Sequence, residues 1–189
     1  MEFTNEETGM STVKKIAITG PESTGKSSLS EALATYYHTE WVPEFAREYL
    51  NNLQRPYRQE DILTIAKGQL EAENLCFGKA NTYLFCDTDP LVTKIWSEVK
   101  YGSCDRWILD RVADHPYDLY LLCDIDLPWT TDPLREHPHF RKQLFDLYQK
   151  DLQFYHFPWA IVSGSGNNRM LNAIKTIDEH FIHTSLVSK

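Results

Sequence analysis

The sequence lacks a long hydrophobic run, a paired set of cysteines and an excess of basic residues. No stretch of its 189 residues approaches the roughly 18 consecutive apolar residues that a transmembrane helix needs. Residues 1–11 are polar and acidic, without the apolar core of a signal peptide. The four cysteines form no C-x-x-C pair, so we expect neither a disulfide framework nor a zinc site. These absences favour a cytoplasmic protein without a membrane anchor.

Acidic residues outnumber basic ones, with 27 Asp and Glu against 19 Lys and Arg and a formal net charge of -8. This balance argues against nonspecific binding to nucleic acid, which depends on Lys and Arg at the phosphates. It argues equally against binding to an anionic membrane surface. A small anionic ligand is still compatible with the charge, because backbone N–H groups can bind one on an acidic protein. Protein partners cannot be read from the sequence.

Short apolar runs alternate with amphipathic segments along the chain. The runs predict strands at residues 15–20, 40–42, 82–86, 119–123 and 159–163, and the periodic segments predict helices at 27–37, 59–76, 140–155 and 169–181. Such strands indicate an α/β fold with a five-stranded parallel sheet covered by helices on both faces. We expect a flexible leader at residues 1–12 and a single domain at residues 13–189. Ligands of such sheets bind beyond the carboxyl ends of the strands.

A phosphate-binding motif follows the first predicted strand and opens the first predicted helix. The string GPESTGKS at residues 20–27 matches G-x-x-x-x-G-K-[ST], in which Lys26 reaches the β- and γ-phosphates and the Ser27 hydroxyl can hold Mg²⁺. Glycines let the backbone wrap closely around the phosphates, and the helix N-terminus adds its dipole. We therefore expect ATP to be bound by Gly20, Pro21, Glu22, Ser23, Thr24, Gly25, Lys26, Ser27 and Ser28.

Two aspartates follow the third predicted strand. Asp87 can orient Mg²⁺ through a water molecule or accept a proton from a substrate hydroxyl. Asp89 can do either as well, but it precedes Pro90 and can equally be the N-cap of the next helix.

Three charged residues follow the second predicted strand. Glu44, Arg47 and Glu48 lie at i, i+3 and i+4, so they share one helical face at the carboxyl edge of the sheet. We interpret them as a polar wall of the acceptor site, with an exposed ion-pair cluster as the alternative.

Polar residues in two further segments are candidates for ligand contacts. Gln69 lies on an apolar helix face, so it must find a partner in the protein or in a ligand. The proline-broken loop after the fourth strand contains Trp129 and Arg135, and Arg141 follows it. Arginines on a lid segment, which we place at about residues 128–142, can close on ATP and exclude water. Ordinary surface arginines are the alternative.

Four strings closely resemble the nicotinamide riboside kinase domain of NadR-type proteins: GPESTGKSSL, WVPEFAREYL, FCDTD and YDLYLLCDIDLPWTTDPLRE. The resemblance covers about residues 15–177 and implies a P-loop kinase fold, ATP with Mg²⁺ as donor and the 5′-hydroxyl of a ribonucleoside as acceptor. It also implies that Glu44, Arg47, Glu48, Asp87 and Asp89 surround the acceptor and that Arg135 belongs to the lid. NadR-type proteins usually carry an adenylyltransferase domain ahead of the kinase, and we do not expect one in these 189 residues.

Together these features predict a kinase that phosphorylates nicotinamide riboside. We expect catalytic roles for Lys26, Asp87 and Glu44, and Mg²⁺ at Ser27 and Asp87. We expect the aromatic residues Trp41, Tyr49 and Trp129 near a cationic ring. The expected acceptor contacts are Glu44, Arg47, Glu48, Gln69, Asp89 and Trp129.

Two alternatives remain open at this point. One is a kinase for another nucleoside or for a nucleoside monophosphate, whose phosphate would need an arginine cluster drawn from Arg47, Arg55, Arg58, Arg106 and Arg111. The other is a regulatory ATPase of the AAA kind, which typically takes an arginine finger from a neighbouring subunit.

Overall fold

A five-stranded, all-parallel sheet forms the centre of the protein. The computed structural model describes residues 13–114 and 117–187, so the predicted leader at residues 1–12 lies outside the described part. The strands are β1 (Lys14–Thr19), β2 (Trp41–Val42), β3 (Tyr83–Asp87), β4 (Leu119–Cys123) and β5 (Trp159–Val162), in the spatial order β2-β3-β1-β4-β5. All five predicted strands are therefore confirmed, and β4 has the predicted bounds.

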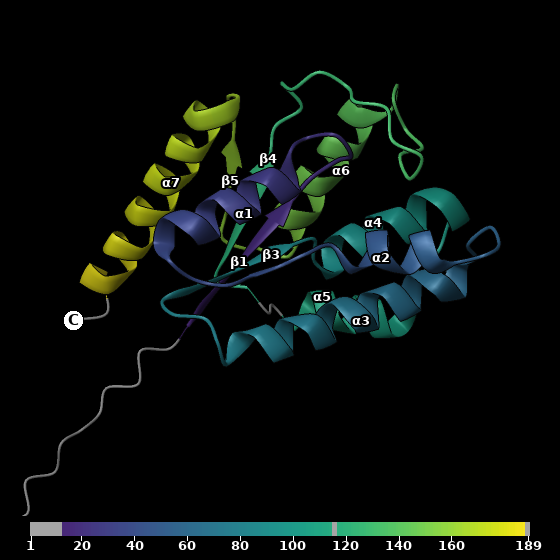
Figure 1. Cartoon of the computed structure of the whole chain (residues 1–189), viewed down its shortest axis with the longest axis horizontal. Coiled ribbons are helices and arrows are strands. Elements are labelled where there is room, and N and C mark those ends of the chain that lie inside the picture. Colours follow the sequence, from purple (N-terminus) through teal and green to yellow (C-terminus); the bar gives the residue numbers. More distant parts are fainter. Residues whose placement is uncertain (1–12, 115–116, 188–189) are drawn as a thin grey trace, which may run out of the picture.

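Helices connect the strands and cover both faces of the sheet (Figure 1). They are α1 (Lys26–Tyr37), α2 (Phe45–Asn52), α3 (Gln59–Phe77), α4 (Pro90–Tyr101), α5 (Arg106–Ala113), α6 (Arg141–Phe154) and α7 (Gly166–Val187). Among the described helices, none combines the length and the apolar character that a membrane crossing requires.

The core lies on both sides of the sheet because successive side chains of a strand point to opposite faces. On β1, Ile16 and Ile18 pack in one cluster with buried residues of α1 and α7. Ala17, between them, belongs to a second cluster that includes Leu91 of α4 and Leu144 of α6. Because both faces are covered, the strands are apolar throughout, which is why their sequence shows no alternation.

The sequence predicts α2 and α4 without bounds, from the helical spacing of Glu44, Arg47 and Glu48 and from Asp89 as an N-cap, and it does not predict α5 at all. Helix α5 has two turns, and only Ile108 and Val112 of its residues are buried. Two apolar positions are too few to give a helical period. Its start is still encoded locally, since Asp105 accepts a hydrogen bond from the Trp107 N–H at 2.8 Å.

The carboxyl edge of the sheet brings the ends of β1, β3 and β4 together. The chain leaves β1 at Gly20 with a φ of +128°, which an L side chain rarely adopts. A Cβ at this position would lie 3.0 Å from the backbone oxygen of Cys123, at the end of β4. Glycine is therefore required here for two reasons, and it allows the following loop to turn back over the edge of the sheet.

Candidate active site

The loop between β1 and α1 forms the expected phosphate cradle. Ser23 and Gly25 adopt positive φ values of 59° and 76°, which turn the backbone before α1 begins at Lys26. The Thr24 hydroxyl donates to the Pro21 oxygen at 2.8 Å, so the turn is closed internally. The Lys26 ammonium donates to the backbone oxygens of Gly20 and Pro21 at 2.9 and 3.0 Å. The lysine thus points into the loop whose ligand it is expected to bind.

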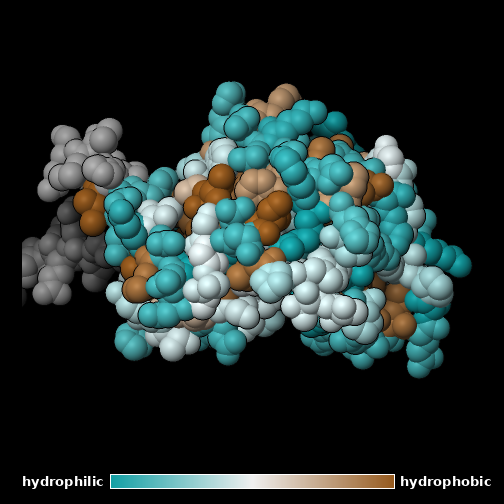
Figure 2. All heavy atoms as spheres, turned by 90° about the horizontal axis from the view of Figure 1, so that it is seen from above, coloured by the Kyte–Doolittle hydropathy of each residue, from teal (hydrophilic) through white to brown (hydrophobic). Residues whose placement is uncertain are grey.

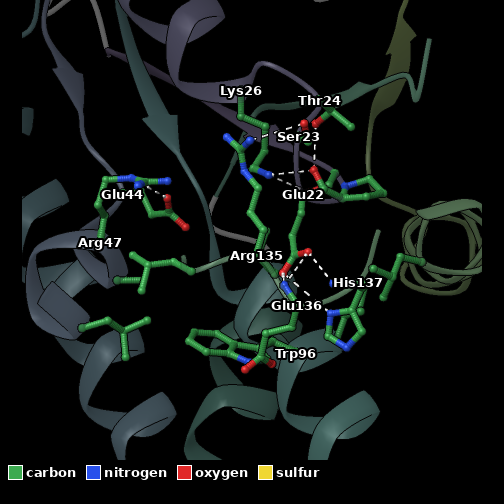
Figure 3. A pocket seen from close by; sticks show the side chains of 18 of the residues that line it. Glu22, Ser23, Thr24, Lys26, Glu44, Arg47, Trp96, Arg135, Glu136 and His137 are labelled. Atoms are coloured by element: carbon green, nitrogen blue, oxygen red, sulfur yellow. Dashed lines mark hydrogen bonds and ion pairs between the residues drawn. The ribbon is translucent and has the colours of Figure 1, made fainter. Parts of the chain in front are cut away.

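A pocket of about 510 Å³ opens from this loop across the carboxyl edge of the sheet. All nine residues expected to bind ATP, Gly20 to Ser28, line it, and so do Glu44, Arg47 and Arg135. In Figure 3, Arg135 extends across the pocket toward Ser23 and Lys26, while Glu44 and Arg47 lie on one wall. The pocket is further lined by Arg55, Tyr57, Trp96, Lys100, Glu136 and His137.

Asp87 lies behind the pocket wall. It ends β3, is 1% exposed, and neither of its carboxylate oxygens has a hydrogen-bond partner in the described residues. Burial raises the pKa of Asp87 to about 6, although Lys26 and Ser27 act to lower it. A buried carboxylate without a partner, next to the lysine and serine of the phosphate motif, is the kind of group that a positively charged ligand would satisfy.

Glu44 is the carboxylate that lines the pocket itself. It occupies the N-cap position of α2, where β2 has just ended, and its side chain is 28% exposed. One of its oxygens lies 3.8 Å from the Arg47 Nε. The spacing of Glu44 and Arg47 on one helix face, expected from the sequence, thus holds in the structure.

Gln69 joins the two segments that carry these carboxylates. Its side-chain oxygen accepts from the Phe45 N–H at 2.9 Å, and its amide nitrogen lies 3.4 Å from the Asp87 backbone oxygen. Gln69 is 3% exposed and does not line the pocket. Of the two readings left open for this residue, the core glutamine satisfied by the protein fits these bonds.

Several residues expected near the acceptor lie elsewhere. Asp89 caps α4 by accepting from the Leu91 N–H at 2.7 Å, so its N-cap reading is confirmed. Neither Glu48, which is exposed, nor Trp129 is among the pocket-lining residues.

The aromatic wall expected from the sequence is wrong for two further residues. Trp41 packs against the core cluster beneath α1 and α7, and the Tyr49 hydroxyl donates to Asp61 at 2.8 Å. The aromatic residues that do line the pocket are Tyr57, Trp96 and Tyr148. No motif marked them, because they come from a loop and from the apolar sides of α4 and α6.

The segment predicted as a lid passes over the phosphate loop. Its backbone N–H groups at Glu136 and His137 donate to the Glu22 carboxylate at 3.0–3.2 Å. The Arg141 guanidinium donates to the Ser23 backbone oxygen at 3.1 Å, and the Thr130 N–H donates to the Ser23 hydroxyl at 2.9 Å. Figure 2 looks down on the molecule from the top of Figure 1, where this segment lies, and apolar residues form small separated groups there among hydrophilic ones.

The comparisons with known proteins agree with this site. Residues 15–169 match the family described as "AAA domain". The chain belongs to the AAA domain family. The P-loop is a sequence signature of ATP-binding proteins. Membership of this family therefore agrees with the phosphate cradle that the structure shows at residues 20–28.

Relatives of this AAA domain confirm the resemblance to NadR-type proteins. The chain is 26% identical over 178 residues to the trifunctional NAD biosynthesis/regulator protein NadR of Salmonella typhimurium, covering 88% of this chain and 42% of the relative. It is 29% identical over 127 residues to the Escherichia coli NadR, covering 65% and 31%. The chain thus spans less than half the length of these curated relatives.

Solved structures confirm the P-loop kinase fold of this AAA domain. A NadR protein in complex with NR superposes with a TM-score of 0.72 at 22% identity, covering 89% of this chain and 51% of that one. A NadR protein in complex with NAD and AMP-PNP gives the same TM-score at 20% identity, with 89% and 50% covered. Thymidylate kinase from Ehrlichia chaffeensis gives 0.62 at 17% identity, with 87% and 98% covered.

The residues of this AAA domain fit the Mg²⁺ that phosphoryl transfer from ATP requires. Mg²⁺ prefers oxygen ligands and is usually held by one or two carboxylates, several waters and the phosphates of the substrate. The Ser27 hydroxyl and the unpartnered oxygens of Asp87 supply protein oxygens of this kind. No group of three or more His, Cys, Asp or Glu residues suited to a metal occurs in residues 13–114 and 117–187.

Proposed function

We propose that the chain is an ATP-dependent kinase that phosphorylates the 5′-hydroxyl of nicotinamide riboside to give nicotinamide mononucleotide. The observation that carries the proposal is the pocket, which is lined both by the P-loop and by a wall that contains Glu44. An ATPase without an acceptor needs only the first of these. The similarity to NadR, of which one structure holds NR, supports nicotinamide riboside as the acceptor.

Two cations of the chain would bind the phosphates of ATP. Lys26 lies in the loop, and the Arg135 guanidinium lies 3.4 Å from the Ser23 hydroxyl of the same loop. Both can stabilise the charge that builds up on the transferred phosphoryl group. Ser27 and Asp87 would hold Mg²⁺, which neutralises phosphate charge when bound. The lid segment over the loop would exclude water and so favour transfer over hydrolysis.

Glu44 is the carboxylate that an acceptor hydroxyl in the pocket would meet. Its side chain is partly exposed, whereas Asp87 is covered by the surrounding wall. A carboxylate in contact with the hydroxyl can orient it and receive its proton as the phosphoryl group arrives. This placement favours Glu44 for direct contact and Asp87 for the metal. The expectation that Asp87 itself accepts the proton stays a prediction.

Trp96 is the pocket aromatic that can face a cationic ring. Its ring centroid lies 5.1 Å from that of Tyr57, and the Lys100 ammonium, paired with Glu136, already lies 3.9 Å from the Tyr57 centroid. An aromatic face near a cation contributes about 0.5–2 kcal/mol. Trp96 takes the role that we expected for Trp41, Tyr49 and Trp129.

ADP release over a panel of acceptors tests the proposal. With Mg²⁺ and ATP saturating, nicotinamide riboside should exceed uridine, adenosine and nicotinic acid riboside in kcat/KM, by at least about tenfold over uridine, which corresponds to about 1.4 kcal/mol. Nucleoside monophosphates should be the poorest acceptors. Lys26→Ala, folded by circular dichroism, should lower turnover by orders of magnitude. Equal or better use of uridine or a monophosphate would contradict the nicotinamide assignment and leave the kinase assignment standing.

A further inference from the structure

The cations that line the pocket are paired with acids at one end and not at the other. At the phosphate-loop end, Lys26 donates to backbone oxygens, and Arg135 contacts Ser23 and a backbone oxygen. Within the described residues, neither forms an ion pair with a carboxylate. At the acceptor end, by which we mean the pocket-lining residues outside the phosphate loop and the lid segment, Arg47, Arg55 and Lys100 each have a carboxylate partner.

Two of those carboxylates come from the lid segment. The Arg47 Nη1 lies 3.0 Å from the Asp132 carboxylate, and the Lys100 ammonium lies 2.8 Å from the Glu136 carboxylate. Glu136 also accepts from the Tyr57 hydroxyl at 2.8 Å. Asp132 is 18% exposed and its partner Arg47 45%, while Glu136 is 37% exposed and its partner Lys100 31%, so solvent and salt screen both pairs in part.

The third pair has a structural role. The Arg55 guanidinium binds Asp61 with two hydrogen bonds of 2.7 and 2.8 Å, and this arginine lowers the pKa of Asp61. Asp61 also accepts from the Arg58 N–H at 2.6 Å at the start of α3. Removing Asp61 would therefore disturb the helix start as well as the charge. Each lid acid accepts through both carboxylate oxygens, and Asp132 also accepts from the Leu134 N–H at 2.9 Å, so an amide at either position removes the charge and keeps one accepting oxygen.

From this pairing we infer that Asp132 and Glu136 are specificity-determining residues that make the acceptor end of the pocket select against phosphorylated acceptors. A phosphate ester is bound through unpaired Arg and Lys side chains, and the lid acids occupy those at this end. The inference rests on the proposed function for the identity of the acceptor. Beyond that function, the inference names Asp132 and Glu136, two carboxylates of the lid segment, as the residues that make the site discriminate a nucleoside from its monophosphate.

The carboxylates of Asp132 and Glu136 also affect the release of the phosphorylated product. Transfer converts a neutral or cationic nucleoside into a phosphate ester, so the site must release an anion that it has just made. Cations that are already neutralised by Asp132 and Glu136 hold this anion weakly. The lid acids should therefore weaken product binding.

Direct binding of a monophosphate to the whole chain tests this inference. Calorimetry would measure the Kd of nicotinamide mononucleotide, and of uridine monophosphate as a second probe, with Mg²⁺ and ADP saturating the phosphate loop. The test protein is Asp132→Asn/Glu136→Gln. The matched control is Asp110→Asn/Glu179→Gln, which removes the same charge from two helical ion pairs that do not line the pocket.

We expect the lid variant to bind both monophosphates about tenfold more tightly than wild type, with less tightening at high salt, and the control to stay within about twofold. Adding Arg47→Met and Lys100→Met to the lid variant should remove the gain, because the freed cations would be gone. Equal tightening in the control, or no tightening in the lid variant, would overturn the inference. Failure of the proposed function would be seen separately, as the absence of nucleoside-stimulated ADP release by the wild-type protein.

Discussion

At the scale of single residues, the two carboxylates of the site differ in burial although both follow a strand end. Asp87 closes an interior strand and is buried, whereas Glu44 follows an edge strand of two residues and lines the pocket. Burying a charge without a partner costs free energy, so the position of Asp87 trades stability for function.

Asp87→Asn should stabilise the protein at pH 7–8 while lowering its activity. In the folded protein, burial raises the pKa of Asp87 from 3.8 to about 6. The folded state therefore binds more protons than the unfolded state between these values, and stability falls as pH rises through this window. The variant should gain about 1–3 kcal/mol in unfolding free energy at pH 7.5, and the gain should vanish below about pH 4. Denaturation in EDTA measures this.

The matched control for this prediction is Asp110→Asn on the outer side of α5, which should give no such gain. A loss of stability in Asp87→Asn at pH 7.5 would show that the carboxylate is stabilised by partners that the structure does not contain.

Glu44→Gln should act on the acceptor. If its carboxylate contacts the reacting hydroxyl, the variant should lose about 10²–10⁴-fold in kcat/KM for the nucleoside, with the KM for ATP close to that of wild type. Steady-state kinetics with each substrate varied in turn measures both constants. An unchanged kcat/KM for the nucleoside would exclude Glu44 from the reaction and leave Asp87 as the candidate base.

At the scale of single residues, the sequence predicts the P-loop well because its geometry is local. Gly20 to Ser28 are consecutive, so one motif defines the whole cradle. The acceptor end is assembled from the loop before α3, from α4 and from the lid segment. Tyr57, Lys100 and Glu136 meet there only in three dimensions, at sequence separations of 36 to 79 residues. No spacing rule of the sequence contains this contact.

At the scale of elements, α2 is positioned by its contact with α3. A Cβ on Gly68 would lie 2.3–2.6 Å from the ring of Phe45, so α2 packs on α3 at a point where only glycine fits. The neighbouring Gln69 holds the Phe45 N–H. Phe45 directly follows Glu44, so this close approach determines where the pocket carboxylate lies.

Gly68→Ala should therefore move Glu44. The ring of Phe45 must shift to admit the methyl group, which should cost about 1–3 kcal/mol of stability and raise the KM for the nucleoside several-fold. Gly78→Ala, just beyond the end of α3, is the matched control, because nothing lies within 4 Å of its Cβ. The control should be neutral or slightly stabilising. Thermal melts and acceptor kinetics on both variants test this, and similar behaviour of the two would contradict it.

The elements themselves were predictable to different degrees. Strands such as β4 consist of continuous apolar residues between polar ends, which leaves little choice of bounds. Helix α6 was expected from residue 140 and begins at Arg141, with Leu144, Tyr148 and Leu152 on its buried side. Helix α5 is not predicted from the sequence because its burial comes from contacts with α3 and α4, and its own sequence pattern hardly shows this burial.

At the scale of the whole molecule, the site is built within one chain. The lining residues come from the phosphate loop, α2, the loop before α3, α4, the lid segment and α6 of the same chain. Arg135 contacts the phosphate loop from within this chain. A regulatory ATPase of the AAA kind would instead take an arginine from a neighbouring subunit.

The turnover per molecule should therefore not depend on protein concentration. ADP release with saturating Mg²⁺, ATP and nicotinamide riboside should scale linearly with protein over about a hundredfold range, since Arg135 of the same chain supplies the arginine beside the phosphate loop. A specific activity that rises steeply with protein concentration, and that does not respond to an acceptor, would favour the regulatory ATPase.

The destination of the γ-phosphoryl group tests the central claim most directly. The protein would be incubated with Mg²⁺, γ-labelled ATP and nicotinamide riboside, and the label in the nucleotide product would be compared with the label in inorganic phosphate. The account predicts that most of the label appears in nicotinamide mononucleotide, as a 5′-phosphate ester, and that Lys26→Ala abolishes its formation. Label that appears only as inorganic phosphate, at the same rate with and without the nucleoside, would contradict the account.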